Sequence, residues 1–236
     1  IDDMLDYYSI PGTRYLYRYS REDPRPMPVV GARDCPYRCT FCVHEQSATG
    51  SIYRGRSYEN VMEEIGLLYE RYEFNVLVIL DELFAINKKR LKSFCDIMMK
   101  NRDEYHWDFD WIFQTHANAG LDQASIQLAK DAGCYSFSYG MESASKTVLK
   151  SMKKKSRPEQ LVEAIELCDR VKIGFGGNFI FGDPSETLET VGETLDFLRD
   201  HCMDLHMVLA DIKPYPGSGL FLDCLDKGII TDKHQF

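Results

Sequence analysis

The feature that most constrains the fold of this chain is a regular alternation of short apolar runs with amphipathic helical patterns. Six runs are predicted to be strands, at residues 28–32, 76–80, 111–113, 135–139, 177–181 and 207–212. Helical patterns lie between them, at 58–72, 87–100, 121–132, 158–171 and 186–200. The run Val76–Leu80 contains no polar residue, as expected for a strand buried on both faces. Strands that alternate with helices form parallel sheets, so we predict an α/β fold.

Six βα-type units are too few to close the usual eight-stranded barrel. We therefore predict an open, partial (β/α)6 TIM-like barrel over residues 26–217. Residues 1–25 are expected to lead in from an upstream region, and 218–236 to begin a C-terminal extension. Chemistry in parallel α/β folds lies at the carboxyl ends of the strands, so site residues should follow strands.

Composition excludes several classes of function. The net charge is −9, and the longest cationic cluster is Lys153–Lys155, which argues against nucleic acid as the partner. No apolar stretch is long enough to cross a bilayer, and no secretory signal opens the chain. Five scattered cysteines lie within apolar patterns: Cys95, Cys134, Cys168, Cys202 and Cys224. We expect them to be small, buried apolar residues rather than disulfide partners. A chain without disulfides favours a reducing, cytoplasmic compartment.

Three further cysteines are crowded onto one loop after the first predicted strand. Cys35, Cys39 and Cys42 are separated by three and two residues. Three thiolates on a short loop can converge on one metal centre, and in a four-iron cluster they leave one iron without a protein ligand. An open coordination position is what a metal centre needs in order to bind a substrate.

Two other interpretations of the cysteines compete with a cluster. Cys39 and Cys42 alone match a thioredoxin-like redox pair, but Cys35 then has no role. Cys35, Cys39, Cys42 and His44 can form a Cys3His zinc site in a non-catalytic binding domain.

The cysteine spacing, with the aromatic Phe41 before the last cysteine, resembles the signature of the radical S-adenosylmethionine (SAM) superfamily. The resemblance covers residues 28–217 and implies that Cys35, Cys39 and Cys42 ligate a [4Fe–4S] cluster, with Phe41 against the adenine of SAM. It also implies an enzyme that cleaves SAM reductively to start radical chemistry on a small-molecule substrate. An electron donor such as flavodoxin or ferredoxin is then the expected partner.

The resemblance assigns SAM contacts to other strand ends. Asp81 and Glu82 correspond to acceptors of the SAM amino group, although the glycines usual there are absent. Glu142 corresponds to the carboxylate that binds the ribose, assisted by Ser143, which is equally suited to cap a following helix. Asn178, Ile180 and Gly182 correspond to the strand and turn that lie along the adenine. Glu186 falls one residue later than the glutamate of the family pattern. Ser185 is equally suited to cap the following helix.

Three further positions are predicted less specifically. Arg54 or Arg56 suits an anion or a surface salt bridge. His116 follows the third predicted strand and suits either a polar site lining or a core position. Residues at the end of the sixth strand are candidates for the substrate side: Asp211, Lys213 and Tyr215.

Several strings in the chain look most like the cobalamin-dependent branch of the superfamily, for example Arg33–Cys42 and the turn Phe181–Thr187. That likeness implies methyl transfer with cobalamin bound by a domain outside this chain. A methylthiotransferase-type reaction, ring formation and rearrangement remain open, and the residues do not identify the substrate.

Overall fold

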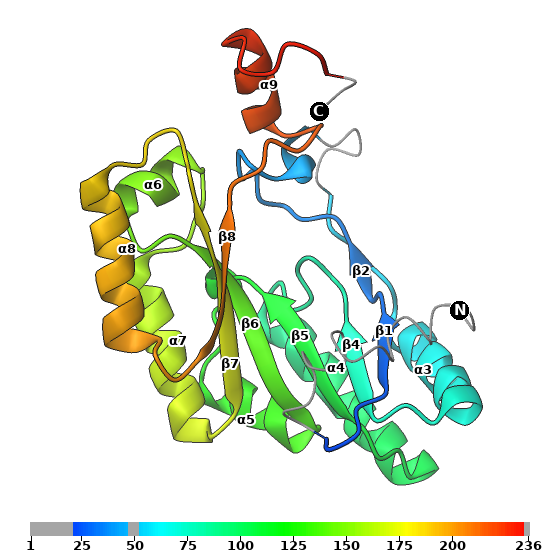
Figure 1. Ribbon diagram of the computed structural model, residues 1–236. Coiled ribbons are helices and arrows are strands. Elements are labelled where there is room, and N and C mark those ends of the chain that lie inside the picture. Colours follow the sequence, from blue (N-terminus) through cyan, green and yellow to red (C-terminus); the bar gives the residue numbers. More distant parts are fainter. Residues whose placement is uncertain (1–20, 47–51, 234–236) are drawn as a thin grey trace. The chain divides into compact units, whose positions relative to one another are not determined.

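The computed structural model of the chain describes residues 21–46 and 52–233. One sheet has the order β1-β4-β5-β6-β7-β8, so sheet neighbours follow one another along the chain (Figure 1). Its strands are β1 (Pro26–Val29), β4 (Val76–Ile79), β5 (Asp110–Thr115), β6 (Cys134–Glu142), β7 (Gly174–Phe181) and β8 (His206–Asp211). The pairs β1·β4, β4·β5 and β7·β8 are parallel. The strand order runs from β1 to β8 without closing, which confirms the predicted α/β fold with an open six-stranded sheet.

Five helices follow the predicted amphipathic patterns: α3 (Tyr58–Tyr72), α4 (Lys88–Tyr105), α5 (Gln123–Asp131), α7 (Pro158–Val171) and α8 (Leu188–His201). Two shorter helices, α6 (Lys146–Ser151) and α9 (Gly219–Asp226), lie outside those patterns. Short elements complete the described part: the paired strands β2 (Ala32–Arg33) and β3 (Arg54–Gly55), and the 3-10 helices η1 (Val43–Gln46) and η2 (Ala117–Ala119). Asn87 caps α4 as predicted, since its side chain accepts a hydrogen bond from the backbone N–H of Arg90 at 2.9 Å.

Several boundaries differ from the prediction for local reasons. The first strand ends at Val29 rather than at residue 32, because the N–H of Gly31 donates to the Asp81 carboxylate instead of to a strand. Thr187, not Ser185, caps α8, and it forms a capping box with Thr190. Ser185 instead donates to the carboxylate of Asp183. Ser145 is the N-cap residue of α6, so Ser143 does not cap that helix.

The chain divides into two compact units. The described part of the first comprises residues 21–33, 55–138 and 166–175, with α3, α4 and α5 beside β1, β4 and β5 (Figure 1). Its core is aromatic. Phe94 meets Phe84 at 4.8 Å and Trp111 at 5.1 Å between ring centroids, both edge to face, and each such pair stabilises by roughly 0.5–1.5 kcal/mol beyond the burial of its area.

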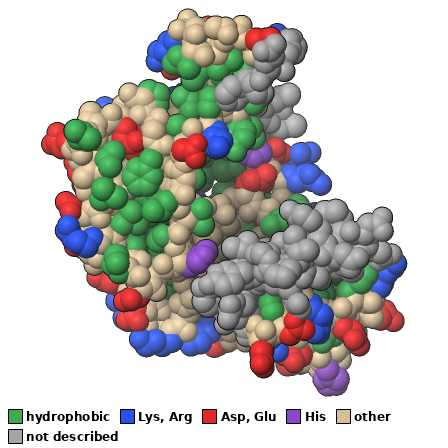
Figure 2. Space-filling view, viewed as in Figure 1, with side chains coloured by type: hydrophobic (Ala, Val, Ile, Leu, Met, Phe, Trp, Pro, Cys, Tyr) green, Lys and Arg blue, Asp and Glu red, His purple; other side chains and the backbone are tan. Residues whose placement is uncertain are grey.

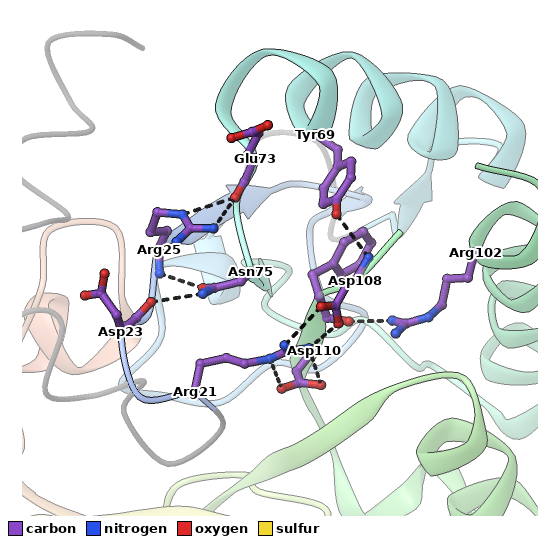
Figure 3. Close-up of polar contacts among 10 residues, drawn as sticks. Arg21, Asp23, Arg25, Tyr69, Glu73, Asn75, Arg102, Asp108 and Asp110 are labelled. Carbon is purple, nitrogen blue, oxygen red and sulfur yellow. Dashed lines mark hydrogen bonds and ion pairs between the residues drawn. The ribbon is translucent and has the colours of Figure 1, made fainter. Parts of the chain in front are cut away.

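A polar network joins the residues that precede the strands of this unit (Figure 3). The Arg21 guanidinium donates to Asp108 and Asp110, at 2.8 Å in each case. These bonds raise the pKa of Arg21. The Asn75 carboxamide accepts from the N–H of Arg25 at 2.7 Å. The network therefore lies at the amino ends of β1, β4 and β5, where residues of parallel α/β folds serve stability rather than chemistry.

The described part of the second unit comprises residues 34–46, 52–54, 139–165 and 176–233. Met141, Leu149 and Phe179 are buried in it. Figure 2 shows hydrophobic side chains gathered over α8, where Leu188 is 94% exposed. The strand β8 is also exposed along most of its length, including Leu209.

The five scattered cysteines are buried, as predicted: Cys95, Cys134, Cys168, Cys202 and Cys224. They are not in disulfides. Within residues 21–46 and 52–233, no helix is both long and apolar enough to cross a membrane.

Candidate functional site

The cysteine loop is held by backbone hydrogen bonds to two later segments of its own unit. The N–H of Thr40 donates to the carbonyl of Met152 at 3.0 Å, at the end of α6. The carbonyl of Thr40 accepts from the N–H of Leu220 at 2.9 Å, in the first turn of α9. Inside the loop, the N–H of Cys42 donates to the carbonyl of Cys39 at 3.0 Å. The loop is therefore fixed at Thr40, directly after Cys39.

The thiols of this loop are suited to bind a cluster. Cys39 is buried, Cys35 and Cys42 are half-buried, and none of the three is in a disulfide. Burial raises the pKa of the Cys39 thiol to about 11, against the opposing effect of Lys154, and Cys42 and Cys35 are close enough to contribute. A bound metal would reverse this effect, because coordination deprotonates a thiol. The donor set thus fits a [4Fe–4S] cluster with three cysteine ligands.

The zinc alternative receives no support from the geometry. In the described part of the chain, no three His, Cys, Asp or Glu side chains are grouped closely enough to hold a single metal ion. His44 lies 3.9 Å from the carboxylate of Asp34, measured from its Nδ1. A four-iron cluster is larger than one ion, and its thiolates bind different irons, so this result bears on zinc and not on the cluster.

Phe41 packs against an apolar cluster formed by α9 and the residues after it. The buried members of that cluster are Leu220, Phe221, Cys224 and Ile230. The Phe41 ring thus packs the cysteine loop against α9. The predicted contact of this ring with adenine stays a prediction.

A buried ion pair lies close to the cysteines. The Lys154 ammonium donates to Glu142 Oε1 at 2.9 Å, and the two side chains are only 7% and 8% exposed. Burial alone would lower the pKa of Lys154, but Glu142, Cys39 and Cys35 outweigh it, and the pKa is raised. The lysine therefore carries its charge at neutral pH, next to two of the predicted cluster ligands.

The backbone is unusual at Glu142. Its φ is 65°, in the left-handed region, although it is not glycine. Of the six described non-glycine residues with positive φ, four lie at or just after helix ends: Glu73, His106, Lys153 and Lys172. The other two are Glu142 and Asp34, which directly precedes Cys35. Such conformations cost about 1–3 kcal/mol and gather at functional sites.

Gly140 lies close to the ends of both side chains of the pair. A side-chain carbon at that position would collide with the Glu142 carboxylate and come within 3.1 Å of Lys154 Nζ. A larger residue here would therefore make the carboxylate or the ammonium shift from its present position.

The side chain of Ser143 forms hydrogen bonds within the protein. Its hydroxyl is 3.1 Å from the hydroxyl of Thr194 on α8 and accepts from the N–H of Ser145 at 3.0 Å. Its predicted assistance in ribose binding remains a prediction.

The strand β7 presents two of the predicted adenine-side residues on one face. Asn178 and Ile180 are half-buried, whereas Phe179 between them points into the core and is 0% exposed. Gly182 follows with φ of 100°, and its N–H donates to the carboxylate of Glu186. Glu186 therefore stabilises the turn through the backbone of Gly182.

Asp81 and Glu82, in the other unit, follow β4 as predicted. Asp81 is 3% exposed, and its Oδ1 accepts from the N–H of Gly31 at 2.7 Å. Burial raises the pKa of this carboxyl, partly offset by the backbone N–H groups of Ala32 and Gly31. Its Oδ2 has no hydrogen-bond partner among the described residues, and a buried oxygen of this kind suits a donor from a ligand. Glu82 is exposed.

The less specific predictions have structural outcomes. Arg54 donates to Asp34 at 2.8 Å, and its side chain is 57% exposed. Arg56 pairs with Glu64. Both arginines therefore form salt bridges, which is the second of the two predicted roles. His116 is buried, and its Nδ1 accepts from the N–H of Asn118.

The sixth-strand candidates lie on the surface. Asp211 and Lys213 form an exposed pair at 3.5 Å, and Tyr215 is 55% exposed.

Lys154 is the site residue that the sequence prediction missed. The available signal was the lysine run 153–155, which appeared to be only a surface cluster. Its burial comes with its pairing to Glu142, twelve residues earlier in the chain, which residue type does not reveal.

The sequence model of the Radical SAM superfamily matches residues 29–198. An uncharacterized methyltransferase of Pyrococcus horikoshii is 31% identical over 82% of this chain and 40% of its own length. The anaerobic magnesium-protoporphyrin IX monomethyl ester cyclase of Rubrivivax gelatinosus is 31% identical over 87% of this chain and 36% of its own length. The chain thus spans well under two thirds of these relatives.

Solved structures share the fold. The radical SAM methyltransferase TsrM of Kitasatospora setae, with cobalamin and a [4Fe–4S] cluster bound, superposes with a TM-score of 0.75 at 19% identity, over 90% of this chain and 38% of that one. The cobalamin-dependent enzyme OxsB, with aqua-cobalamin and SAM bound, gives a TM-score of 0.65 at 21% identity, over 94% of this chain and 32% of that one.

Proposed function

This chain belongs to the radical SAM superfamily, and we propose that it is the catalytic core of an enzyme that cleaves SAM reductively to start radical chemistry on a small molecule. The observation that carries the proposal is the position of the Cys35, Cys39 and Cys42 loop beside the buried pair of Glu142 and Lys154. A reducing compartment, as predicted from the cysteines, is part of the proposal.

The cluster would be held by Cys35, Cys39 and Cys42. When bound, it supplies the electron that breaks a carbon–sulfur bond of SAM. The ammonium of Lys154 would offset the negative charge of the thiolates in a site where little water competes. The backbone bonds of Thr40 to Met152 and Leu220 would fix the loop, so that metal binding costs little reorganisation.

The SAM contacts proposed here follow the strand ends. Glu142 offers a carboxylate acceptor to the ribose hydroxyls, oriented by Lys154. Asp81 offers a buried acceptor oxygen to the amino group, with Glu82 next to it. The half-buried face of β7 with Asn178 and Ile180, together with Gly182, suits the flat adenine, as does Phe41.

Methyl transfer with cobalamin is the reaction subtype that we favour. The relatives include the bacteriochlorophyllide d C-8(2)-methyltransferase of Chlorobaculum tepidum, 25% identical over 96% of this chain. Cobalamin would bind outside this chain. The putative methylthiotransferase of Methanocaldococcus jannaschii, 26% identical, keeps methylthiolation as the second candidate.

The test is anaerobic purification and cluster reconstitution, followed by incubation with SAM and dithionite. We expect a brown protein that contains iron and sulfide and releases 5′-deoxyadenosine. A folded, iron-loaded protein that leaves SAM intact would contradict the proposal, and a colourless protein with bound zinc would favour the binding-domain alternative.

A further inference from the structure

A strongly cationic hollow opens beside the cysteine loop. It has a volume of about 370 Å³ and is lined by α6 and the segment after it: Lys146, Leu149, Lys150, Lys153, Lys154, Lys155, Ser156 and Arg157. Residues 146–157 contain no Asp or Glu, in a chain whose net charge is −9. Two of the lining lysines pair with carboxylates from outside this segment, Lys146 with Glu159 and Lys154 with Glu142. This surface is therefore positively charged, although the net charge of the chain is negative.

The hollow and the candidate site share one residue, Lys154. Lys154 lines the hollow, yet its ammonium is buried against Glu142 and interacts electrostatically with Cys39 and Cys35. Met152, just before the lysine run, accepts the hydrogen bond from Thr40 in the cysteine loop. All of these residues belong to the second compact unit. The cationic surface thus lies next to the predicted cluster ligands, with side chains exposed at Lys150, Lys153, Lys155 and Arg157.

Reductive cleavage of SAM needs one external electron for each SAM cleaved. Electron transfer between proteins falls steeply with distance, so a donor must dock close to the cysteines. On a chain that repels acidic proteins overall, a local cationic surface directs an acidic donor to one place.

We propose that the surface formed by Lys150, Lys153, Lys155 and Arg157 docks an acidic, one-electron carrier protein with a flavin or iron–sulfur centre. In that complex the carrier loses one electron, the cluster bound by Cys35, Cys39 and Cys42 gains it, and no bond is formed or broken. The inference rests on the proposed function for its biological purpose, but the docking can be measured alone.

The test uses reduced and oxidised flavodoxin with the cluster-loaded protein. The docking variant is Lys150→Glu with Lys155→Glu, which leaves Lys154 in place. The matched control is Lys89→Glu with Lys100→Glu on α4, where two exposed lysines undergo the same change of charge. Calorimetry measures flavodoxin binding at low and high salt, and 5′-deoxyadenosine formation is followed with either flavodoxin or dithionite as reductant.

We expect the docking variant to weaken flavodoxin binding by about tenfold or more, and high salt to weaken the wild type similarly, while the control is unaffected. The KM for reduced flavodoxin should rise in parallel, with the dithionite-driven rate unchanged. Equal flavodoxin affinity in the docking variant and the wild type would overturn the proposal, as would binding of an RNA oligonucleotide in place of flavodoxin. Absence of SAM cleavage even with dithionite would instead refute the proposed function, and the calorimetry would still decide the docking.

Discussion

Among single residues, Cys39 has a buried thiol and is followed directly by Thr40, whose backbone N–H and carbonyl both form hydrogen bonds to later segments. We expect Cys39→Ala to lose most of the iron that the wild type retains after reconstitution, because a cluster held by two thiolates has lost its central ligand. Cys168→Ala is the matched control, since Cys168 is equally buried and not in the cysteine loop. Iron and sulfide analysis with the visible absorption spectrum measures both, and equal iron in the two variants would remove the cluster assignment.

The pair of Glu142 and Lys154 gives a second prediction for single residues. Glu142→Ala leaves a buried ammonium unpaired, which typically costs about 3–5 kcal/mol. The contribution of Lys154, whose folded-state pKa is raised, is fully present below its ordinary pKa of 10.5 and is lost only as the pH rises through the higher folded value. The wild-type contribution should therefore be constant between pH 6 and pH 9, and urea unfolding at pH 7 measures the loss in Glu142→Ala.

Two further variants test that interpretation. Glu166→Ala removes a carboxylate that is 61% exposed and paired with Arg170 at 3.7 Å, so it should cost less than about 1 kcal/mol. The double variant Glu142→Leu with Lys154→Met should recover much of the stability, because it leaves no charge unpaired. A Glu142→Ala loss no larger than that of Glu166→Ala would show that the pair is not buried in solution.

Residue types predicted part of this site and could not predict the rest. The cysteines follow a strand and Glu142 ends one, so both could be proposed as site residues in advance. Lys154 could not, because its burial against Glu142 is a tertiary contact between residues that are twelve positions apart. Asp81 was expected to face a ligand, yet one of its oxygens binds Gly31, which is distant in sequence.

For the helices and strands, periodicity predicted most elements but not their ends. The strand β1 contains Pro26 and Pro28, and it is found at the edge of the sheet, where a missing N–H is tolerated. The helices α6 and α9 are too short for a periodic pattern to stand out, and no sequence prediction covered α9. Yet these two helices hold the cysteine loop in place.

The start of α5 provides a prediction for an element. Asp122 accepts from the N–H of Ser125 at 2.9 Å and pairs with Lys88 at 2.8 Å. Asp122→Ala should destabilise the protein by about 1 kcal/mol at pH 7, whereas Asp122→Asn, which can still cap, should cost less.

The pH dependence of the stability lost in Asp122→Ala follows from the lowered pKa of Asp122. The bonds from Lys88 and Ser125 lower the pKa of Asp122, so its stabilising contribution is present above its ordinary value of 3.8 and is lost as the pH falls through the lower folded value. The difference between wild type and Asp122→Ala should therefore shrink in acid, as measured by urea unfolding at pH 7 and pH 3. A difference that grows in acid would contradict the assigned partners.

For the whole molecule, the proposed ligand contacts are distributed unequally between the two compact units. The cysteines, Glu142, Lys154 and the β7 residues belong to one unit, and only Asp81 and Glu82 belong to the other. Since a ligand stabilises what it contacts, SAM should slow amide hydrogen exchange in the cluster-loaded protein mainly at 35–42, 139–154 and 178–182, and near 81. The amides of α3 and α4 should be little affected, because no proposed contact lies on those helices. Cys39→Ala without a cluster should lose the protection, and protection confined to α3 and α4 would mean that SAM binds somewhere other than the site described.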